Sequence, residues 1–367
     1  MEQQELIYRL AMCQIKGIGP VRYKKMIEFA GSAKSIMTAD GKFLRKAIGL
    51  NAKVADMIRS FSDYALIESE IAFTEKNNIQ ILCFDENTYP QKLKLCADSP
   101  SVLFYKGTPM AQNKRVLSVI GTRSYTEYGK RICEELVQQL LPYDVCIVSG
   151  LAYGIDILTH KACTKNNVST IGVLAHSLDS IYPYAHTGTA AEMQLNGGLL
   201  SEYFSNTKPE KQNFPSRNRI VAGMADATVV IETDIKGGSM ITADIAYSYN
   251  RDVYCYPGKV IDAKSAGCNF LIKSLKAQLV TCGEDIATHL GWNTVMKKKP
   301  QQRQLFFDLS PIEEKIIHVL QEKSAVHIDE LYILTDLNSS QIAASILNLE
   351  MQNVIKVMPG KMISMQF

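Results

Sequence analysis

Arg123 lies in a short turn, Gly121-Thr122-Arg123, between an apolar run and a segment of helical periodicity. The run, residues 116–120, is rich in β-branched residues and predicts a buried strand. Ser124 or Thr126 is a suitable N-cap for the helix that follows. Free amides at such a helix N-terminus favour an anion, and the planar guanidinium of Arg123 suits a phosphate. The turn therefore predicts a phosphate site.

A second group of side chains suited to nucleic acid lies between residues 213 and 219. The segment reads Asn213-Phe214-Pro215-Ser216-Arg217-Asn218-Arg219. We expect a loop in which the two arginines grip phosphates, while the second asparagine and the phenylalanine contact a base. Lys208 and Lys211 precede it and add positive charge. Surface arginines of this kind are often purely structural, but their combination with Arg123 favours binding.

Two further turns carry glycine where the backbone must come close to a ligand or to a helix. Gly150 follows the apolar run 145–149. Gly238 and Ser239 open another helical segment, whose first amides are again suited to an anion. Both turns follow predicted strands, so we expect them to contribute backbone amides to the same site.

The usual signatures of an enzyme are missing from the sequence. There is no GxxxxGK[ST] and no GxGxxG, so ATP hydrolysis and nicotinamide chemistry lack their motifs. Asp156 and His160 are four residues apart, but no third ligand accompanies them, and a histidine beside an apolar helix face is most often structural. We expect no catalytic residue, no metal and no cofactor.

The elements that would position these residues alternate between strands and helices from residue 115 to about 290. Apolar strand runs occur at 116–120, 145–149, 169–175, 199–203, 227–232 and 252–258. This alternation predicts an α/β fold with a parallel sheet covered by helices on both faces, whose ligand lies beyond the carboxyl ends of the strands. Residues 79–107 are expected to extend the sheet, which gives an extended Rossmann-like domain over 79–292.

The two ends of the chain predict separate domains. Residues 1–78 are helical in pattern, and the turn at 16–20, KGIGP, resembles a helix-hairpin-helix. A packing module that has lost its DNA contact is an equal alternative there. Residues 293–309 are polar and basic, as in a linker, and residues 310–367 have a winged-helix pattern. The helix in the recognition position, 339–351, has no Arg or Lys, which favours packing or protein interaction over DNA reading.

Composition limits the class of protein. The net charge is only +3, so any basic surface must be local. Nine scattered cysteines, with no CxxC pair, predict reduced thiols in a cytoplasmic protein. The N-terminus lacks the form of a signal peptide, and no apolar run approaches the length of a membrane span, so no membrane association is expected.

Several motifs in one order resemble a known family. They are VLSVIGTRSYTEYGKR, IVSGLAYGIDILTHKA, GLLSEY, NFPSRNRIVAG, GGSMITADIAYSYNRDVYCYPG and GCNFLI. Together they resemble the DprA/Smf family of DNA-processing proteins across residues 80–290. The resemblance implies a protein that binds single-stranded DNA, forms a homodimer through the Rossmann-like domain and loads a RecA-type recombinase in natural transformation, without catalytic activity. The family's motifs fall on Gly121, Thr122, Arg123, Phe214, Pro215, Arg217, Asn218, Arg219, Gly238 and Ser239.

Three positions depart from the family's pattern. Tyr153 stands where arginine is common, His176 lies in a segment that is usually a GCGLD-type loop, and His186 replaces an asparagine. We expect Tyr153 and His176 to substitute for the lost charge by stacking.

Single-stranded DNA binding is thus the expected function, with Gly150 and Lys211 included in the site. The alternative is a Rossmann-like nucleotide hydrolase of the phosphoribohydrolase type, which also uses a Gly-rich loop before a helix. Those enzymes have a PGGxGTxxE signature, and the segment GGSMITADI lacks its catalytic glutamate and arginine.

Overall fold

The computed structural model describes residues 3–46, 50–110, 115–292, 310–323, 326–352, 354–358 and 360–365. The chain forms two compact units, Met1–Lys298 and Lys299–Phe367, each of which is described by itself. The predicted linker, 293–309, lies outside the described residues. No helix in the described ranges is long and apolar enough to cross a membrane.

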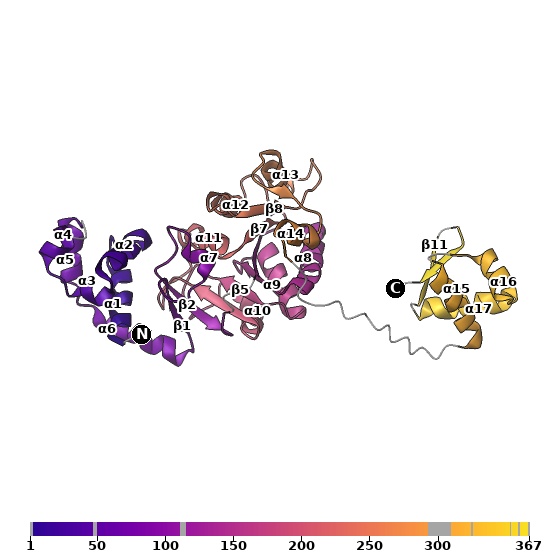
Figure 1. Ribbon diagram of the computed structural model, residues 1–367, viewed down its shortest axis with the longest axis horizontal. Helices are drawn as coiled ribbons and strands as arrows, with labels where there is room; N and C mark the ends of the chain where they lie inside the picture. The colour runs from indigo at the N-terminus through magenta and orange to yellow at the C-terminus, as the bar shows by residue number, and fades with distance from the viewer. Residues whose placement is uncertain are drawn as a thin grey trace. The chain divides into compact units, whose positions relative to one another are not determined.

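The described residues of the first unit contain a nine-stranded sheet (Figure 1). Its strands are β1 (Gln80–Cys83), β2 (Val102–Gly107), β3 (Arg115–Ile120), β4 (Val145–Ser149), β5 (Thr170–Val173), β6 (Gly197–Ser201), β7 (Ala227–Val230), β8 (Asp252–Cys255) and β9 (Gln278–Leu279). The order is β1-β2-β6-β5-β4-β3-β7-β8-β9, parallel from β6 to β9, with β1 and β2 added antiparallel at one edge. The predictions of a parallel sheet and of its extension by residues 79–107 are confirmed.

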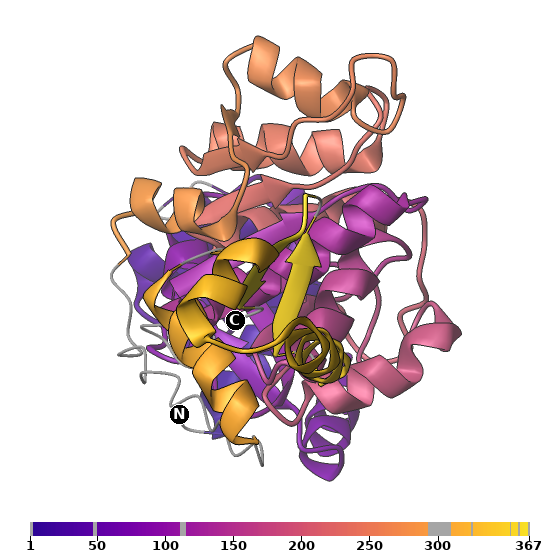
Figure 2. The same cartoon turned by 90° about the vertical axis from the view of Figure 1, so that its right-hand side faces the viewer.

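Helices cover both faces of the sheet, as predicted (Figures 1 and 2). One face packs against α7 (Gln91–Lys94), α11 (Asn213–Met224), α12 (Gly238–Ser248) and α13 (Ala266–Lys273). The other face packs against α8 (Glu127–Leu140), α9 (Ile155–Lys165) and α14 (Gly283–His289), while α10 (Thr187–Met193) packs beside β6. The four strands β4, β5, β6 and β7 are buried along their whole length, because helices lie on both faces of the sheet.

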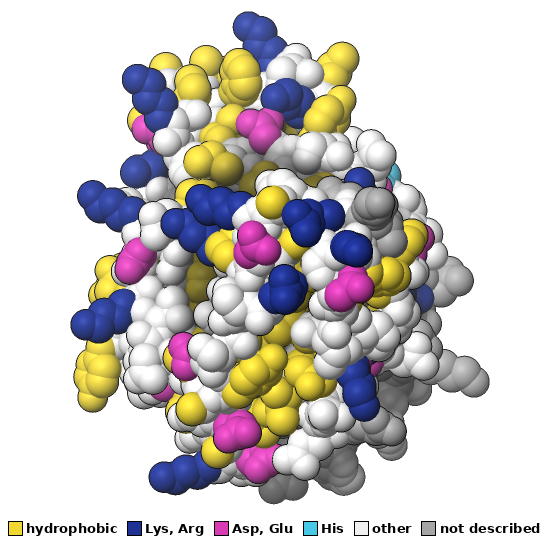
Figure 3. Space-filling model, turned by 90° about the vertical axis from the view of Figure 1, so that its left-hand side faces the viewer, with side chains coloured by type: hydrophobic (Ala, Val, Ile, Leu, Met, Phe, Trp, Pro, Cys, Tyr) yellow, Lys and Arg dark blue, Asp and Glu magenta, His cyan; other side chains and the backbone are white. Residues whose placement is uncertain are grey.

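The N-terminal part is helical, in agreement with the sequence. Its helices are α1 (Gln3–Gln14), α2 (Pro20–Ala30), α3 (Ala33–Met37), α4 (Gly41–Lys46), α5 (Ala52–Arg59) and α6 (Tyr64–Lys76). Pro20 opens α2 at its first position, where no amide hydrogen is needed. The face that these helices present mixes Lys and Arg side chains with hydrophobic ones and a few carboxylates (Figure 3).

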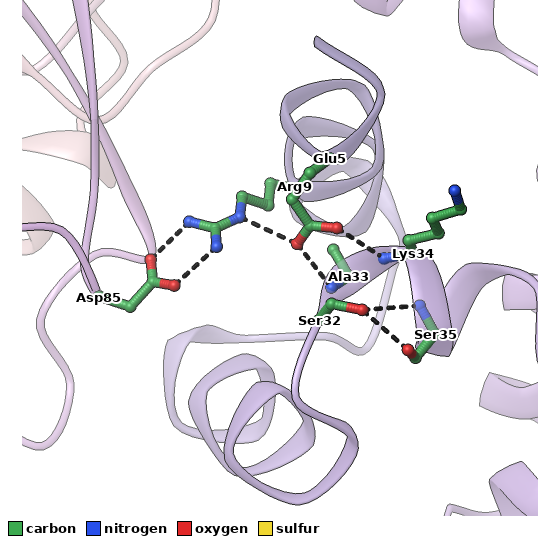
Figure 4. Close-up of polar contacts among 7 residues, drawn as sticks. All are labelled: Glu5, Arg9, Ser32, Ala33, Lys34, Ser35 and Asp85. Carbon is green, nitrogen blue, oxygen red and sulfur yellow. Dashed lines mark hydrogen bonds and ion pairs between the residues drawn. The ribbon is translucent and has the colours of Figure 1, made fainter. Parts of the chain in front are cut away.

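A polar network fastens these helices to the sheet domain (Figure 4). The guanidinium of Arg9 donates to both carboxylate oxygens of Asp85, at 2.5 and 2.7 Å, and to Glu5 at 3.1 Å. Glu5 also accepts from the amides of Ala33 and Lys34 at the start of α3, at 2.8 and 3.0 Å. Arg9 therefore joins the first helices to the loop that follows β1.

The second unit is a winged-helix domain, as the sequence predicted. It comprises α15 (Pro311–Glu322), β10 (Val326–His327), α16 (Ile328–Thr335), α17 (Ser339–Met351), β11 (Ile355–Met358) and β12 (Met362–Met365), with strand order β10-β12-β11. Ser310 and Glu313 form a capping box at the start of α15, at the expected Ser-Pro position.

Candidate nucleic-acid interface

The candidate site lies where the strand order reverses. From β3 the chain builds β4, β5 and β6 outward on one side and then returns to place β7 on the other side of β3. In open α/β sheets such a reversal leaves a crevice beyond the carboxyl ends of the two strands. A pocket of about 410 Å³ occupies it, and among its lining residues are Gly121, Thr122, Arg123, Gly150, Phe214, Arg217, Asn218, Gly238 and Ser239. Lys211 and Arg219 do not line this pocket.

The N-terminus of α8, where the sequence predicted a bound anion, already has a carboxylate of the protein beside it. Thr126 is the N-cap, and its amide and hydroxyl donate to the two carboxylate oxygens of Glu232, at 2.9 and 2.5 Å. Glu232 is fully buried at the end of β7. A Cβ on Gly129 would lie 2.2 Å from this carboxylate, so the glycine makes room for it. The protein's own carboxylate thus compensates the helix dipole.

The segment 213–219 is helical, not a loop as the sequence analysis expected. Asn213 is the first residue of α11, and Pro215 is accepted because it lies in the first turn, where backbone amides have no partner within the helix. Residues three and four apart share one side of a helix, whereas residues two apart diverge. Phe214, Arg217 and Asn218 consequently face the pocket together, and Arg219 points away from it.

Arg217 is a buried structural cation. Its side chain is 5% exposed, and its Nη1 donates to the carbonyl oxygens of Gly150 and Val173, which follow or end neighbouring strands. A Cβ on Gly150 would lie 2.6 Å from this nitrogen, so only glycine leaves room for the guanidinium. Burial lowers the pKa of Arg217, and the nearby carboxylate of Asp156 opposes that effect.

Asp156 engages the backbone of the β4–α9 turn. Its Oδ2 accepts from the amides of Gly150 at 3.2 Å and Ala152 at 3.4 Å. The amide of Gly150 is therefore already bonded within the protein. Burial raises the pKa of Asp156, against the attraction of Arg217. His160 contacts Thr170 instead, with Nδ1 at 2.8 Å from Oγ1, and burial lowers the pKa of His160 to about 3. The two residues therefore form no acid/base pair.

Arg219 and Lys211 lie outside the pocket. Arg219 forms an ion pair with Glu202 and donates to the carbonyl oxygen of Asp98, so its charge is compensated within the protein. Burial raises the pKa of Glu202, although Arg219 opposes this. Lys211 is exposed, just before α11.

Arg123 and the start of α12 remain open to a ligand. Arg123 is exposed, it has no ion-pair partner among the residues described, and its guanidinium lies 5.6 Å from the ring centroid of Phe214. Gly237 caps α12 without a side-chain hydrogen bond, and the following amides of Gly238 and Ser239 have no acceptor in the described part of the chain. A Cβ on Gly238 would meet nothing within 4 Å, so this end of the helix is accessible.

The positions that depart from the family's pattern lie at one side of the pocket. Tyr153 is 51% exposed, which leaves its ring available, but His176 is 1% exposed and the prediction that it stacks on a base is wrong. His186 is also buried, and its ring lies 4.8 Å from that of Tyr153. Tyr182 was not among the predicted site residues, yet its ring is exposed and lies 6.3 Å from that of Phe214. Its position between a strand and a helix, next to Pro183, was the available signal.

The described side chains form neither a metal-binding cluster nor a disulfide. No group of three or more His, Cys, Asp or Glu in the described ranges could hold a metal ion. All nine cysteines are free thiols.

Both units of the chain match families of known proteins. Residues 80–291 match the family of DNA recombination-mediator protein A, and residues 299–361 match the DprA winged helix domain. The Protein Smf of Synechocystis is 29% identical over 98% of both chains. The structure of DNA processing protein A from Streptococcus pneumoniae covers 77% of this chain and 97% of its own, with a TM-score of 0.67 and 30% identity.

A second solved structure concerns the single-stranded DNA binding mode of DNA processing protein A from Helicobacter pylori. It covers 59% of this chain and 97% of its own, with a TM-score of 0.53 and 29% identity. The family match extends over more than half of the chain, including every strand of the sheet and the pocket at its centre. The chain belongs to the DprA/Smf family of DNA recombination-mediator proteins.

Proposed function

We propose that the pocket binds single-stranded DNA. The observation that carries the proposal is the pairing of Arg123 with Phe214 at 5.6 Å, because it places an uncompensated cation beside an aromatic ring. A phosphate bound to the guanidinium would set the attached base against the ring. The relative from Helicobacter pylori, described by its single-stranded DNA binding mode, supports the same ligand here.

The residues have distinct proposed roles. Arg123, Thr122 and the turn at Gly121 hold one phosphate, and the open amides of Gly238 and Ser239 hold another. Phe214 stacks on a base, and Asn218 contacts a base edge. Gly150 and Arg217 maintain the wall of the pocket, while Arg219 fastens α11 through Glu202. Exposed Lys211 adds positive charge near the entrance.

The wider role rests on the family. We propose that the chain acts in the cytoplasm as a homodimer formed through its Rossmann-like domain, and that it loads a RecA-type recombinase on incoming strands without catalysing a reaction. The proposed domains are 1–78, 79–292 and 310–367, with a linker at 293–309. A nucleotide hydrolase is not favoured, because the segment GGSMITADI lacks the catalytic glutamate and arginine of the phosphoribohydrolase signature.

The test compares single-stranded and duplex DNA across a salt series, with the full chain. We expect tighter binding of the single strand and a log-log slope of about −0.7 for each phosphate contacted. Arg123→Ala should weaken binding and make the slope shallower by about 0.7. Arg131→Ala is the matched control, because Arg131 is an exposed arginine on α8 outside the pocket. Equal affinity for duplex DNA at the same salt would contradict the proposal.

A further inference from the structure

A small notch adjoins the pocket on the side of β5. Its volume is about 30 Å³, and it shares the Arg123 and Phe214 side chains with the larger pocket. Its remaining wall includes three side chains with no part in the proposed function so far: Tyr153, His176 and Tyr182. The notch therefore lies next to the place proposed for the first nucleotide.

Two tyrosine rings flank the notch and are half exposed. Tyr153 is 51% and Tyr182 is 52% exposed. Each is held by a T-shaped contact with another ring, Tyr153 with His186 at 4.8 Å and Tyr182 with Phe214 at 6.3 Å. Such contacts fix the orientation of a ring while leaving much of its surface to solvent. Exposed rings with fixed orientation are suited to stacking on the bases of a single strand.

His176 contributes an unused hydrogen-bond acceptor. Its Nδ1 lies 2.8 Å from the carbonyl oxygen of Ser177, which can only accept, so Nδ1 carries the hydrogen. Burial lowers the pKa of His176, an effect that outweighs the opposing carbonyls of Ser177 and Tyr182. The ring is then neutral with a lone pair on Nε2, which is buried and has no partner within hydrogen-bond distance and angle in the described residues, although the Tyr182 carbonyl lies near the ring. A buried acceptor without a partner is unfavourable until a donor reaches it.

We propose that Tyr153, Tyr182 and the notch at His176 form a second base subsite, next to the nucleotide held by Arg123 and Phe214. This inference rests on the proposed function. The base stacks on the tyrosine rings and directs an exocyclic amino group to Nε2 of His176. About 30 Å³ admits such a group but not a whole base ring. Cytosine and adenine carry this amino group, whereas thymine presents a carbonyl oxygen there, whose lone pairs repel that of Nε2.

The test measures binding of dC and dT homopolymers of equal length to the full chain by fluorescence anisotropy. Tyr153→Ala should weaken binding of dC about 5- to 100-fold, and Tyr153→Phe should preserve it, because the ring carries the stacking. Tyr184→Ala is the control, since Tyr184 is 85% exposed and lines neither the pocket nor the notch. Tyr182→Ala should also weaken binding. The result for Tyr153 is the decisive one, because Tyr182 contacts Phe214 and its loss would also disturb the first base position.

The preference between bases tests the hydrogen bond. Wild-type protein should bind dC about 2- to 10-fold more tightly than dT. His176→Leu should remove this preference. Tyr153→Ala should remove it as well, and because Tyr153 is exposed, this second test does not depend on whether a protein with an altered core still folds. If Arg123→Ala weakens binding while Tyr153→Ala and Tyr182→Ala bind like wild type, the subsite is refuted and the proposed function stands. If wild type does not bind single strands, both are refuted.

Discussion

The carboxylate of Glu232 accepts two hydrogen bonds from Thr126, one from the amide and one from the hydroxyl. The two residues are 106 positions apart in sequence and meet at the carboxyl ends of β7 and β3. The contact places a buried carboxylate beside the N-terminus of α8 and fixes the end of the turn that carries Arg123. Because this carboxylate compensates the dipole of α8, the amides at the start of α12 are the better candidate for binding an anion.

Thr126→Val should destabilise the sheet domain by about 1–2 kcal/mol, because one oxygen of a buried carboxylate loses its donor. Urea unfolding can be followed through the single tryptophan, Trp292, which packs against the core between the sheet and α8. Thr164→Val is the control, since the hydroxyl of Thr164 donates to a carbonyl at the surface. An equal loss of unfolding free energy in both variants would show that the hydrogen bond to Glu232 stabilises the protein no more than a surface hydrogen bond does.

Arg217→Met should lower the free energy of unfolding by about 3–5 kcal/mol. We expect no other arginine substitution in the pocket to lower it as much. The change leaves the carbonyl oxygens of Gly150 and Val173 without a donor and Asp156 without a nearby positive charge. Adding Asp156→Asn should recover part of the loss, and a double-mutant cycle read by Trp292 fluorescence measures the coupling. Strictly additive effects would mean that the two charges do not interact.

Local patterns were sufficient to predict many elements of the fold. Residues 145–149 form a strand with the predicted bounds, and 339–351 form the predicted helix. Thr126 was one of two predicted N-caps. These features depend on neighbouring residues in sequence, on side-chain period and on capping, so the sequence carries them directly.

The electrostatic partners in the site could not be predicted in the same way. Glu232 with Thr126, and Arg219 with Glu202, pair residues that only the sheet brings together. The divergence of Arg217 and Arg219 follows from helical geometry, which the proline at 215 concealed, since proline occurs both in loops and in the first helical turn. Residue types therefore predicted a phosphate site, but the structure was needed to separate the exposed cation, Arg123, from the arginines whose charge is used within the protein.

The stability of the sheet domain should fall as the pH is lowered below about 6.5, partly through His160. Burial holds the pKa of His160 at about 3 in the folded state, against about 6.5 when unfolded. Between these values the unfolded state binds the additional proton, so stability rises with pH. From pH 6.5 to pH 5 this residue should cost about 2 kcal/mol.

His160→Gln isolates this contribution, because glutamine retains a donor for Thr170 and does not titrate. Urea unfolding at pH 7 and pH 5 should show a smaller loss of stability in this variant than in wild type. Identical pH dependence in the two proteins would exclude His160 as a cause.

Arg9→Met should loosen the N-terminal helices without unfolding the sheet. The change removes a bidentate ion pair to Asp85 and a bond to Glu5, whereas Lys24 keeps its bonds to the carbonyl oxygens of Cys96 and Ala97. We expect amide hydrogen exchange in α1 and α3 to become about 5- to 100-fold faster, which corresponds to about 1–3 kcal/mol.

Exchange in the buried strands β4 and β7 should stay unchanged, because Arg9 contacts the sheet domain only near its edge, at Cys83 in β1 and at Asp85 after it. Arg59→Met on α5 is the control, since Arg59 is exposed and has no ion-pair partner among the described residues. If amide hydrogen exchange in α1 and α3 is equally fast in the Arg9→Met and Arg59→Met variants, the ion pair with Asp85 does not hold the N-terminal helices to the sheet domain. Faster exchange in β4 as well would mean that the helices stabilise the whole sheet domain.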